Sequence, residues 1–216
     1  MKYIIVYNET IRSKIIYTKF INERNSDIIC AIRIPVLTKN KSGKTSTFLI
    51  KKLLNSNNRL KFFHFFQIFI YQLLGFFNNS SLTKLLKKNN IKVYELKKFP
   101  NELFLKSLQK EKGTPVIIFA STTTILKEEN LKNNVILNFH EGPENYKGSA
   151  IFYYLALKEE KNYYTMITQP DLGIDTGKVI KKSNLISIEG KSIFQIFLSG
   201  VYEQSKLIFH ITNLEL

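Results

Sequence analysis

Val135-Ile-Leu-Asn-Phe-His140 is a short apolar run that ends on a histidine, and the fold can be predicted by working outward from it. Its length and its aliphatic and aromatic content are typical of a buried strand. Runs of the same kind recur upstream, separated by stretches with helical features. These upstream runs are Lys2–Asn8, Asp27–Ile34, Ile91–Leu96 and Pro115–Ala120.

Helical signals lie between the predicted strands. Phe48–Asn55 and Ser80–Lys88 have helical spacing of apolar residues, and Asn101–Gly113 begins at a capping Asn and ends at a Gly. This alternation predicts an α/β fold with an open, mainly parallel, doubly wound (Rossmann-like) sheet. A chain of 216 residues, 44% of them hydrophobic, fits a single domain over 1–216, with its motifs in the half from 115 to 200.

The net charge of +15 is the most extreme feature of the composition, and it directs attention to anionic partners. Most of the positive charge is lysine scattered among Asn and Ile, without an arginine-rich stripe or a nucleic-acid-binding motif. We therefore expect no nucleic acid as partner, and a phosphate-bearing small substrate accounts better for the charge. The arginines are Arg12, Arg24, Arg33 and Arg59.

The number of cysteines and the N-terminal sequence indicate the cellular compartment of the protein. Cys30 is the single cysteine, which excludes an internal disulfide and a multi-cysteine zinc site, and its apolar surroundings predict a core position. The first eight residues run directly into strand-like sequence without the basic start and small-residue cleavage site of a secretory signal. We expect a cytoplasmic protein.

Phe62–Phe77 is strongly apolar and aromatic. It is shorter than the roughly 20 residues that a membrane-spanning helix needs, and it contains His64, Gln67 and Gln72. We predict a helix packed against the sheet or against another chain, which makes a homodimer one alternative, and we expect no membrane span.

Two segments resemble phosphate-binding loops only in part. Lys39–Ser46 contains Gly-Lys-Thr but lacks the first Gly of a P-loop, and no strand leads directly into it. Tyr7–Ser13, which follows the first predicted strand, lacks G-x-G-x-x-G. The sequence therefore supports neither a P-loop nor Rossmann-type dinucleotide binding.

Candidate catalytic residues cluster after the later strands. Ligands of doubly wound sheets bind at the carboxyl ends of the strands, which directs attention to the loops after Ala120 and His140. Strand periodicity places Asn138 and His140 on one face. Farther on, the strand-like run Tyr163–Thr168 leads into Asp171-Leu-Gly-Ile-Asp175-Thr-Gly177, where either carboxylate could face His140.

An amide, an imidazole and a carboxylate together suit acyl transfer, because they can stabilise an oxyanion, move a proton and orient the imidazole. No nucleophilic Ser or Cys motif accompanies them, which favours direct transfer over a covalent intermediate. A histidine at a strand end is also often a structural group, and the residues by themselves leave that alternative open.

At these positions the sequence resembles the folate-dependent formyltransferases, a family that includes glycinamide ribonucleotide formyltransferase, methionyl-tRNA formyltransferase and the sugar N-formyltransferases. Asn138-Phe-His140 is similar to the family's Asn-x-His, Tyr146-Lys147-Gly148 to its Tyr-Arg/Lys-Gly, and Leu172–Gly177 to its Asp-Thr-Gly loop. The resemblance covers roughly residues 85 to 200. It departs in Glu141–Asn145, which lacks the usual Leu-Pro, is one residue shorter and adds two glutamates beside the site.

The resemblance implies a formyltransferase-type catalytic domain in which Asn138, His140 and Asp175 act on 10-formyltetrahydrofolate as co-substrate, with no metal. In this reading Asn138 and protonated His140 stabilise the oxyanion, and Asp175 orients His140 and accepts the amine proton. The residues implied for the folate pocket are Ser121, Thr122, Thr123, Gln169, Asp171 and Gly173, with Asp171 supporting the loop. Those implied for the acceptor are Tyr146, Lys147 and Gly148.

Within the family, the expected acceptor is the amine of a nucleotide-linked amino sugar. A methionyl-tRNA enzyme would carry a further RNA-binding domain, and Tyr7-Asn-Glu-Thr10 is a poor substitute for the Gly/Ser-rich phosphate loop of glycinamide ribonucleotide enzymes. The alternatives are glycinamide ribonucleotide as acceptor, hydrolysis of formyltetrahydrofolate by the same residues, and a non-catalytic relative that binds a nucleotide or a partner protein.

Overall fold

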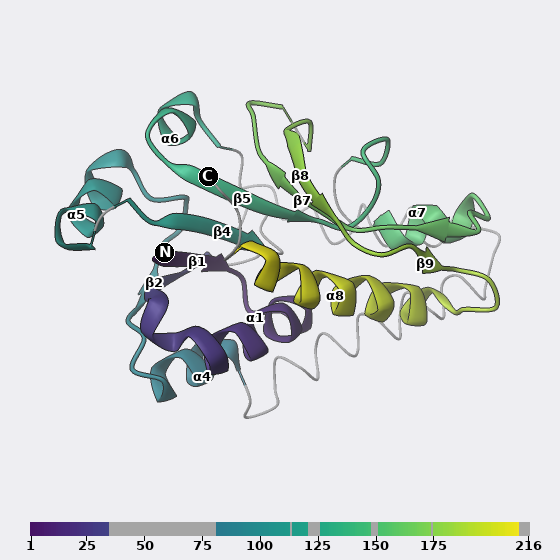
Figure 1. Ribbon diagram of the computed structural model, residues 1–216, viewed down its shortest axis with the longest axis horizontal. Coiled ribbons are helices and arrows are strands. Elements are labelled where there is room, and N and C mark those ends of the chain that lie inside the picture. Colours follow the sequence, from purple (N-terminus) through teal and green to yellow (C-terminus); the bar gives the residue numbers. More distant parts are fainter. Residues whose placement is uncertain (35–80, 113, 121–125, 148–150, 174, 212–216) are drawn as a thin grey trace, which may run out of the picture.

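The computed structural model describes residues 1–34, 81–112, 114–120, 126–147, 151–173 and 175–211. Within them, a seven-stranded sheet has the order β3-β2-β1-β4-β5-β7-β8, and β6 and β9 form a small second sheet (Figure 1). The strands are β1 (Tyr3–Tyr7), β2 (Ile28–Arg33), β3 (Val93–Glu95), β4 (Val116–Ala120), β5 (Val135–His140), β6 (Asn162–Tyr163), β7 (Met166–Gln169), β8 (Lys178–Lys182) and β9 (Ile186–Ser187). The helices are α1 (Ile11–Arg24), the 3-10 turn η1 (Asn25–Asp27), α4 (Leu82–Lys88), α5 (Glu102–Lys112), α6 (Glu128–Lys132), α7 (Ile151–Leu157) and α8 (Ile193–His210).

The predicted α/β class and the mainly parallel sheet are confirmed. Strands β3, β2, β1, β4 and β5 pair in parallel, while β7 and β8 continue the sheet in antiparallel pairing. All five predicted apolar runs up to His140 contain a strand, and β1 and β4 at the centre are buried throughout. Parallel strands covered on both faces need such continuous apolar runs.

The predicted strand Tyr163–Thr168 is wrong as a single element. Tyr163 pairs in the small sheet with Ile186, and β7 begins only at Met166. Tyr163 is buried below α8, where its hydroxyl donates to the Ile196 carbonyl at 2.5 Å. The chain therefore changes sheets between these strands, and an unbroken apolar and aromatic pattern does not reveal that change.

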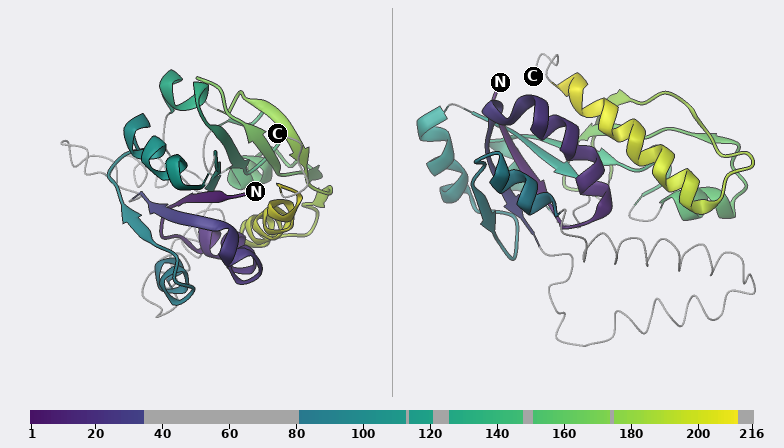
Figure 2. Two further views of the ribbon diagram at one scale, coloured as in Figure 1. Left: turned by 60° about the vertical axis from the view of Figure 1, so that its left-hand side comes forward. Right: turned by 90° about the horizontal axis from the view of Figure 1, so that it is seen from below.

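Helices cover both faces of the sheet (Figures 1 and 2). Helices α1, α4, α7 and α8 contribute to one apolar core, which includes Tyr17, Phe20 and Phe197. The other core, with Leu105 of α5 and the predicted core residue Cys30, lies on the opposite face. Burial on both faces is what a doubly wound sheet requires.

Helices α1 and α8 lie side by side and begin at polar caps (Figure 2). The Thr10 side chain accepts from the Ser13 backbone N–H, and Ser192 and Gln195 form a reciprocal capping box. These contacts satisfy backbone donors that the first helical turn would otherwise leave free.

Two predicted helices, Phe48–Asn55 and Phe62–Phe77, and the predicted loop Lys39–Ser46 lie outside the described residues. Asn101 caps α5 as predicted, since its side chain accepts from the Phe104 backbone N–H at 3.0 Å. None of the helices in the described part of the chain has the length and apolar character needed to cross a bilayer.

Candidate active site

The three side chains predicted to be catalytic meet at the end of β5. Asn138 Nδ2 lies 3.4 Å from Asp175 Oδ1, and His140 Nδ1 lies 3.3 Å from the same oxygen. Strand periodicity places Asn138 and His140 on the same face, and β7, which pairs antiparallel with β5, returns the chain to bring Asp175 beside them. The predicted convergence is therefore present, whereas the catalytic role of the three residues stays a prediction.

His140 is buried, with 3% of its surface exposed, and both ring nitrogens face oxygen atoms. Nε2 lies 2.6 Å from the carbonyl oxygen of Tyr146, and Nδ1 faces the Asp175 carboxylate. A carbonyl oxygen can only accept a hydrogen bond, so Nε2 carries a hydrogen. Nδ1 is consequently the ring nitrogen available to reacting groups, and a doubly protonated ring would donate to both oxygens.

Asp175 is held in an unusual backbone conformation. Its φ of 51° lies in the left-handed region, which costs a non-glycine residue about 1 kcal/mol or more and which Asp and Asn tolerate best. Two residues later, a Cβ added at Gly177 would lie 2.0 Å from the Gln169 carbonyl oxygen. The Asp-Thr-Gly order thus suits a turn that needs a left-handed Asp followed by close backbone packing.

Asp171, the other carboxylate of this loop, is exposed and stabilises the turn. Its Oδ1 accepts from the Gly173 N–H at 2.9 Å and from the Thr176 hydroxyl at 2.5 Å. These two hydrogen bonds, first that of Thr176, lower the pKa of Asp171. The structure thus brings Asp175, and not Asp171, to His140.

The residues predicted to bind the acceptor have different surroundings. Tyr146 is buried; its hydroxyl donates to Glu160 at 2.6 Å, a contact that raises the pKa of Tyr146 to about 12. Its backbone carbonyl is the partner of His140. Lys147 is exposed to solvent, and Gly148 lies outside the described residues. Binding of an acceptor by any of these residues stays a prediction.

Each of the two glutamates in the shortened loop forms an ion pair with a basic side chain. Glu141 turns inward and pairs with Arg12 at 2.5 Å, and Glu144 pairs with Lys182 at 2.7 Å. Glu144 also accepts from the Tyr164 hydroxyl. The expectation of added negative charge at the site is corrected accordingly, because each carboxylate has its own cation.

The Glu144 pair makes stability depend on pH. Hydrogen bonds from Lys182 and Tyr164 lower the pKa of Glu144 from 4.5 to about 2, so the ionised pair stabilises the fold above about pH 4.5 and loses this contribution as the pH falls toward 2. Because Glu144 is half-exposed, we expect Glu144→Gln to cost at most about 1 kcal/mol at pH 7 and less at pH 3. Urea unfolding at both values measures the difference.

The matched control for this prediction is Glu189→Gln, since Glu189 is exposed and shows no ion pair with any residue that the structure describes. Its cost should be the same at both pH values. An equal loss of stability for Glu144→Gln at pH 7 and pH 3 would show that the lowered pKa of Glu144 does not contribute to folding.

Of the residues predicted to line the folate pocket, Ser121, Thr122 and Thr123 lie outside the described part of the chain. Gln169 ends β7 and is exposed, as are Asp171 and Gly173 in the loop that follows. These three lie on the segment that leads to Asp175. Their contact with folate stays a prediction.

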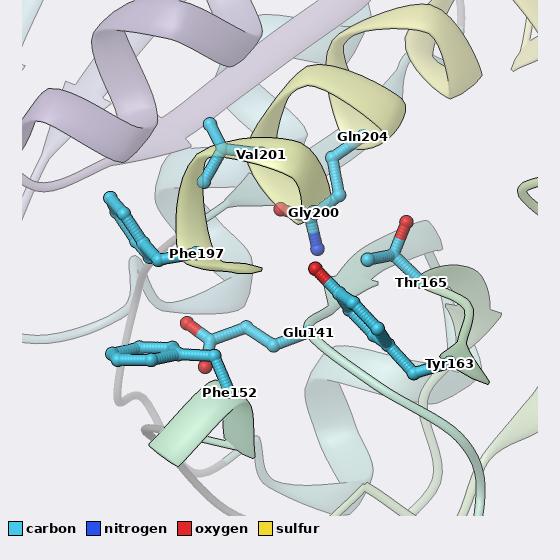
Figure 3. A pocket seen from close by; sticks show the side chains of 8 residues that line it. All are labelled: Glu141, Phe152, Tyr163, Thr165, Phe197, Gly200, Val201 and Gln204. Carbon is cyan, nitrogen blue, oxygen red and sulfur yellow. The ribbon is translucent and has the colours of Figure 1, made fainter. Parts of the chain in front are cut away.

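A small cavity lies behind the end of β5 (Figure 3). Its volume is only about 10 Å³, barely room for one water molecule, whereas small-molecule sites begin at roughly 300 Å³. Its lining includes Glu141, Thr165 and Gln204 together with apolar Phe152 and Phe197, but not the three predicted catalytic residues. We therefore do not assign the substrates to this cavity.

Sequence reasoning missed three contributors to this region: Arg12, Gln204 and the Tyr146 carbonyl. Arg12 is buried although it is charged, and it is one of few arginines in a lysine-rich chain. That scarcity, together with its place directly after the first strand, is a signal that could have singled it out. No sequence signal identifies a backbone carbonyl or a helical Gln as a partner of a distant strand.

Comparison with known proteins gives no match to a family model or to a curated protein, but it does find solved structures of the same fold. A glycinamide ribonucleotide transformylase from Symbiobacterium toebii aligns with 96% of this chain and 84% of its own, at 10% identity and a TM-score of 0.62. This chain has a formyltransferase fold. A phosphoribosylglycinamide formyltransferase from Streptococcus pneumoniae aligns with 99% of this chain and 98% of its own, at 15% identity and a TM-score of 0.61.

An N-formyltransferase from Helicobacter canadensis, solved with folinic acid and dTDP-3-aminofucose, has the same formyltransferase fold. It aligns with 99% of this chain and 64% of its own, at 18% identity and a TM-score of 0.55. The neighbours thus include enzymes of two acceptor classes. At these identities the comparison shows the fold and leaves the reaction to be argued from the site.

Proposed function

We propose that this chain is a single catalytic domain that transfers a formyl group from 10-formyltetrahydrofolate to an amine. The observation that carries the proposal is the meeting of Asn138, His140 and Asp175 at the carboxyl end of β5, on a fold that solved formyltransferases share. Folinic acid in the Helicobacter canadensis structure supports a folate as the donor.

The site can stabilise negative charge on the formyl oxygen. Asn138 Nδ2 and His140 Nδ1 both approach one oxygen, Asp175 Oδ1, so these groups are already arranged around a negatively charged oxygen atom. In the reaction, attack by the amine nitrogen on the formyl carbon gives a tetrahedral oxyanion, which would take the place of Asp175 Oδ1 as acceptor of the hydrogen bonds from Asn138 Nδ2 and from Nδ1 of a protonated His140. Preorganised donors of this kind are among the largest contributions to enzyme catalysis.

Asp175 would handle the proton of the attacking amine. Its carboxylate orients His140 before the reaction, through the 3.3 Å contact with Nδ1, and is partly accessible, with 18% of the side chain exposed. As the new C–N bond forms, the amine proton passes to Asp175, directly or through a water molecule, and the bond between the formyl carbon and folate N10 breaks as this proton is passed on to N10. The products are tetrahydrofolate and the N-formylated acceptor.

For the acceptor we propose the amine of a nucleotide-linked amino sugar. The loop after β1, where a glycinamide ribonucleotide enzyme would be expected to bind phosphate, contains Glu9. The Glu9 carboxylate accepts from the Leu82 backbone N–H at 2.6 Å and from the Thr83 hydroxyl at 2.5 Å. A carboxylate fixed in this loop disfavours a phosphate group there. The amino-sugar complex from Helicobacter canadensis supports the same choice.

The test is to mix the protein with 10-formyltetrahydrofolate, with and without an acceptor, and to follow tetrahydrofolate release. Acceptors are a dTDP-linked amino sugar and glycinamide ribonucleotide. The proposal expects release with the amino sugar and little without an amine. Release that is independent of any amine would identify a hydrolase. Faster release with glycinamide ribonucleotide than with the amino sugar would make glycinamide ribonucleotide the acceptor. Absence of release in every arm would contradict formyl transfer.

A further inference from the structure

The last two residues of β5 lie beyond its pairing with β4. The register between these strands runs from Val116 and Val135 to Phe119 and Asn138, which leaves Phe139 and His140 past the last pair. On the other side of β5, both residues pair with β7, and their backbone carbonyls also accept hydrogen bonds from side chains. Arg12 Nη2 donates to the Phe139 carbonyl at 2.9 Å, and Gln204 Nε2 donates to the His140 carbonyl at 2.8 Å.

Arg12 and Gln204 are also bound to each other. Arg12 Nε donates to Gln204 Oε1 at 3.0 Å, and Arg12 Nη1 donates to Glu141 Oε1 at 2.5 Å. The second carboxylate oxygen of Glu141 accepts from the Ile151 backbone N–H at 3.3 Å, at the start of α7. We call Arg12, Gln204 and the carbonyls of Phe139 and His140 the β5 clamp.

The β5 clamp joins distant parts of the chain at one point. Arg12 comes from the first turn of α1 and Gln204 from the middle of α8, helices that lie side by side (Figure 2). Gln204 is 1% exposed. Gln204 and Glu141 both line the cavity behind the strand end (Figure 3).

We propose that Gln204 and Arg12 are positioning residues, which fix the end of β5 so that the His140 ring keeps its place between the Tyr146 carbonyl and Asp175. Neither side chain contacts Asp175 Oδ1, where Asn138 and His140 meet. Gln204 instead binds the backbone carbonyl of His140. Displacements of about 1 Å at reacting groups can lower rates about a hundredfold, so this support has a measurable consequence. The activity readout rests on the proposed function.

Gln204→Glu separates the two contacts of Gln204. A glutamate keeps an oxygen acceptor for Arg12 but cannot donate to the His140 carbonyl when ionised. We expect kcat to fall about tenfold or more, with KM for both substrates changed less than about twofold. Gln204→Met removes both contacts and should lower kcat at least as much.

The matched control is Gln195→Glu, the same substitution on the same helix. Gln195 forms the capping box with Ser192, and glutamate serves equally well at that position, so kcat and melting temperature should stay at wild-type values. Because Gln195 is exposed, this control accounts for an added negative charge on the surface of α8, and Gln204→Met, which adds no charge, accounts for the burial of one.

A second readout does not depend on formyl transfer. The chain has three histidines, so the ring signals of His140 can be assigned by their absence in a His140→Asn spectrum. In long-range ¹H–¹⁵N spectra of the wild type, the hydrogen on Nε2 should exchange slowly with solvent, because the ring is buried and donates to Tyr146. In Gln204→Glu the exchange should be at least about tenfold faster.

Faster exchange in Gln204→Glu, with unchanged exchange in Gln195→Glu, supports the positioning role even if the wild type transfers no formyl group. The exchange measurement therefore distinguishes failure of the proposed function from failure of the positioning role. Wild-type exchange in a folded Gln204→Glu protein would overturn the inference. So would a kcat for Gln204→Glu equal to that of the wild type, or an equal loss in Gln195→Glu.

Discussion

Replacing His140 by asparagine is expected to lower kcat for formyl transfer about a hundredfold. Loss of one preorganised donor to a developing oxyanion typically costs about 3 kcal/mol of transition-state stabilisation, which corresponds to that factor. KM for either substrate should change much less, because the hydrogen bond from Nδ1 strengthens only when the oxyanion forms. Steady-state kinetics of the purified variant measure both constants.

Asparagine is shorter than histidine, so its neutral amide reaches about as far as Nδ1 and not as far as Nε2. His140→Asn and His140→Ala therefore both leave the Tyr146 carbonyl, which Nε2 now contacts, without its partner, and both should cost about 1–3 kcal/mol of folding stability as well. Thermal melting of both variants measures this cost apart from the loss of rate. A His140→Asn protein that is folded and keeps kcat within threefold of the wild type would exclude His140 from the chemistry.

Asp175→Asn is expected to lower kcat by about a hundredfold as well. The amide has nearly the shape of the carboxylate, and Asn also tolerates the left-handed conformation that Asp175 adopts, so the backbone should be preserved. It cannot accept the amine proton, and it removes the negative charge that faces His140 Nδ1 at 3.3 Å. Single-turnover kinetics with saturating substrates measure this step without product release.

Asp171→Asn is the matched control for the Asp175 prediction, since it makes the same change four residues earlier in the same loop. Asparagine Oδ1 can still accept the hydrogen bonds from Gly173 and Thr176, so the turn should persist and the rate should fall less than about threefold. If Asp171→Asn were the more damaging of the two, the carboxylate assignment would have to move from Asp175 to Asp171.

Much of the fold could be predicted because buried parallel strands have a distinctive composition. The runs that became β1, β2, β4 and β5 are short, apolar and separated by helical signals, and each contains a strand close to the predicted bounds. The break between Tyr163 and Met166 could not be predicted, since it depends on burial of Tyr163 under α8. Local patterns do not encode such a tertiary contact.

The catalytic candidates could be predicted where residues of suitable chemistry are spaced so that one face of a strand carries them. Asn138 and His140 are spaced to share a face, and the structure brings Asp175 to both. Their surroundings were not predictable. The Tyr146 carbonyl at His140 Nε2 is a backbone group, and Arg12 and Gln204 are brought to β5 by two helices from opposite ends of the chain. Only the folded arrangement makes these groups neighbours.

The most direct test of the central claim is to follow the formyl carbon itself. The protein is incubated with 10-formyltetrahydrofolate labelled with ¹³C in the formyl group and with a dTDP-linked amino sugar, and the label is traced by NMR. We expect the ¹³C signal to appear in an N-formyl amide of the sugar in equal amount to the tetrahydrofolate released, and to be nearly lost with His140→Asn. Appearance of the label as free formate, or its retention on the folate with the sugar and with every other amine supplied, would contradict formyl transfer by this chain.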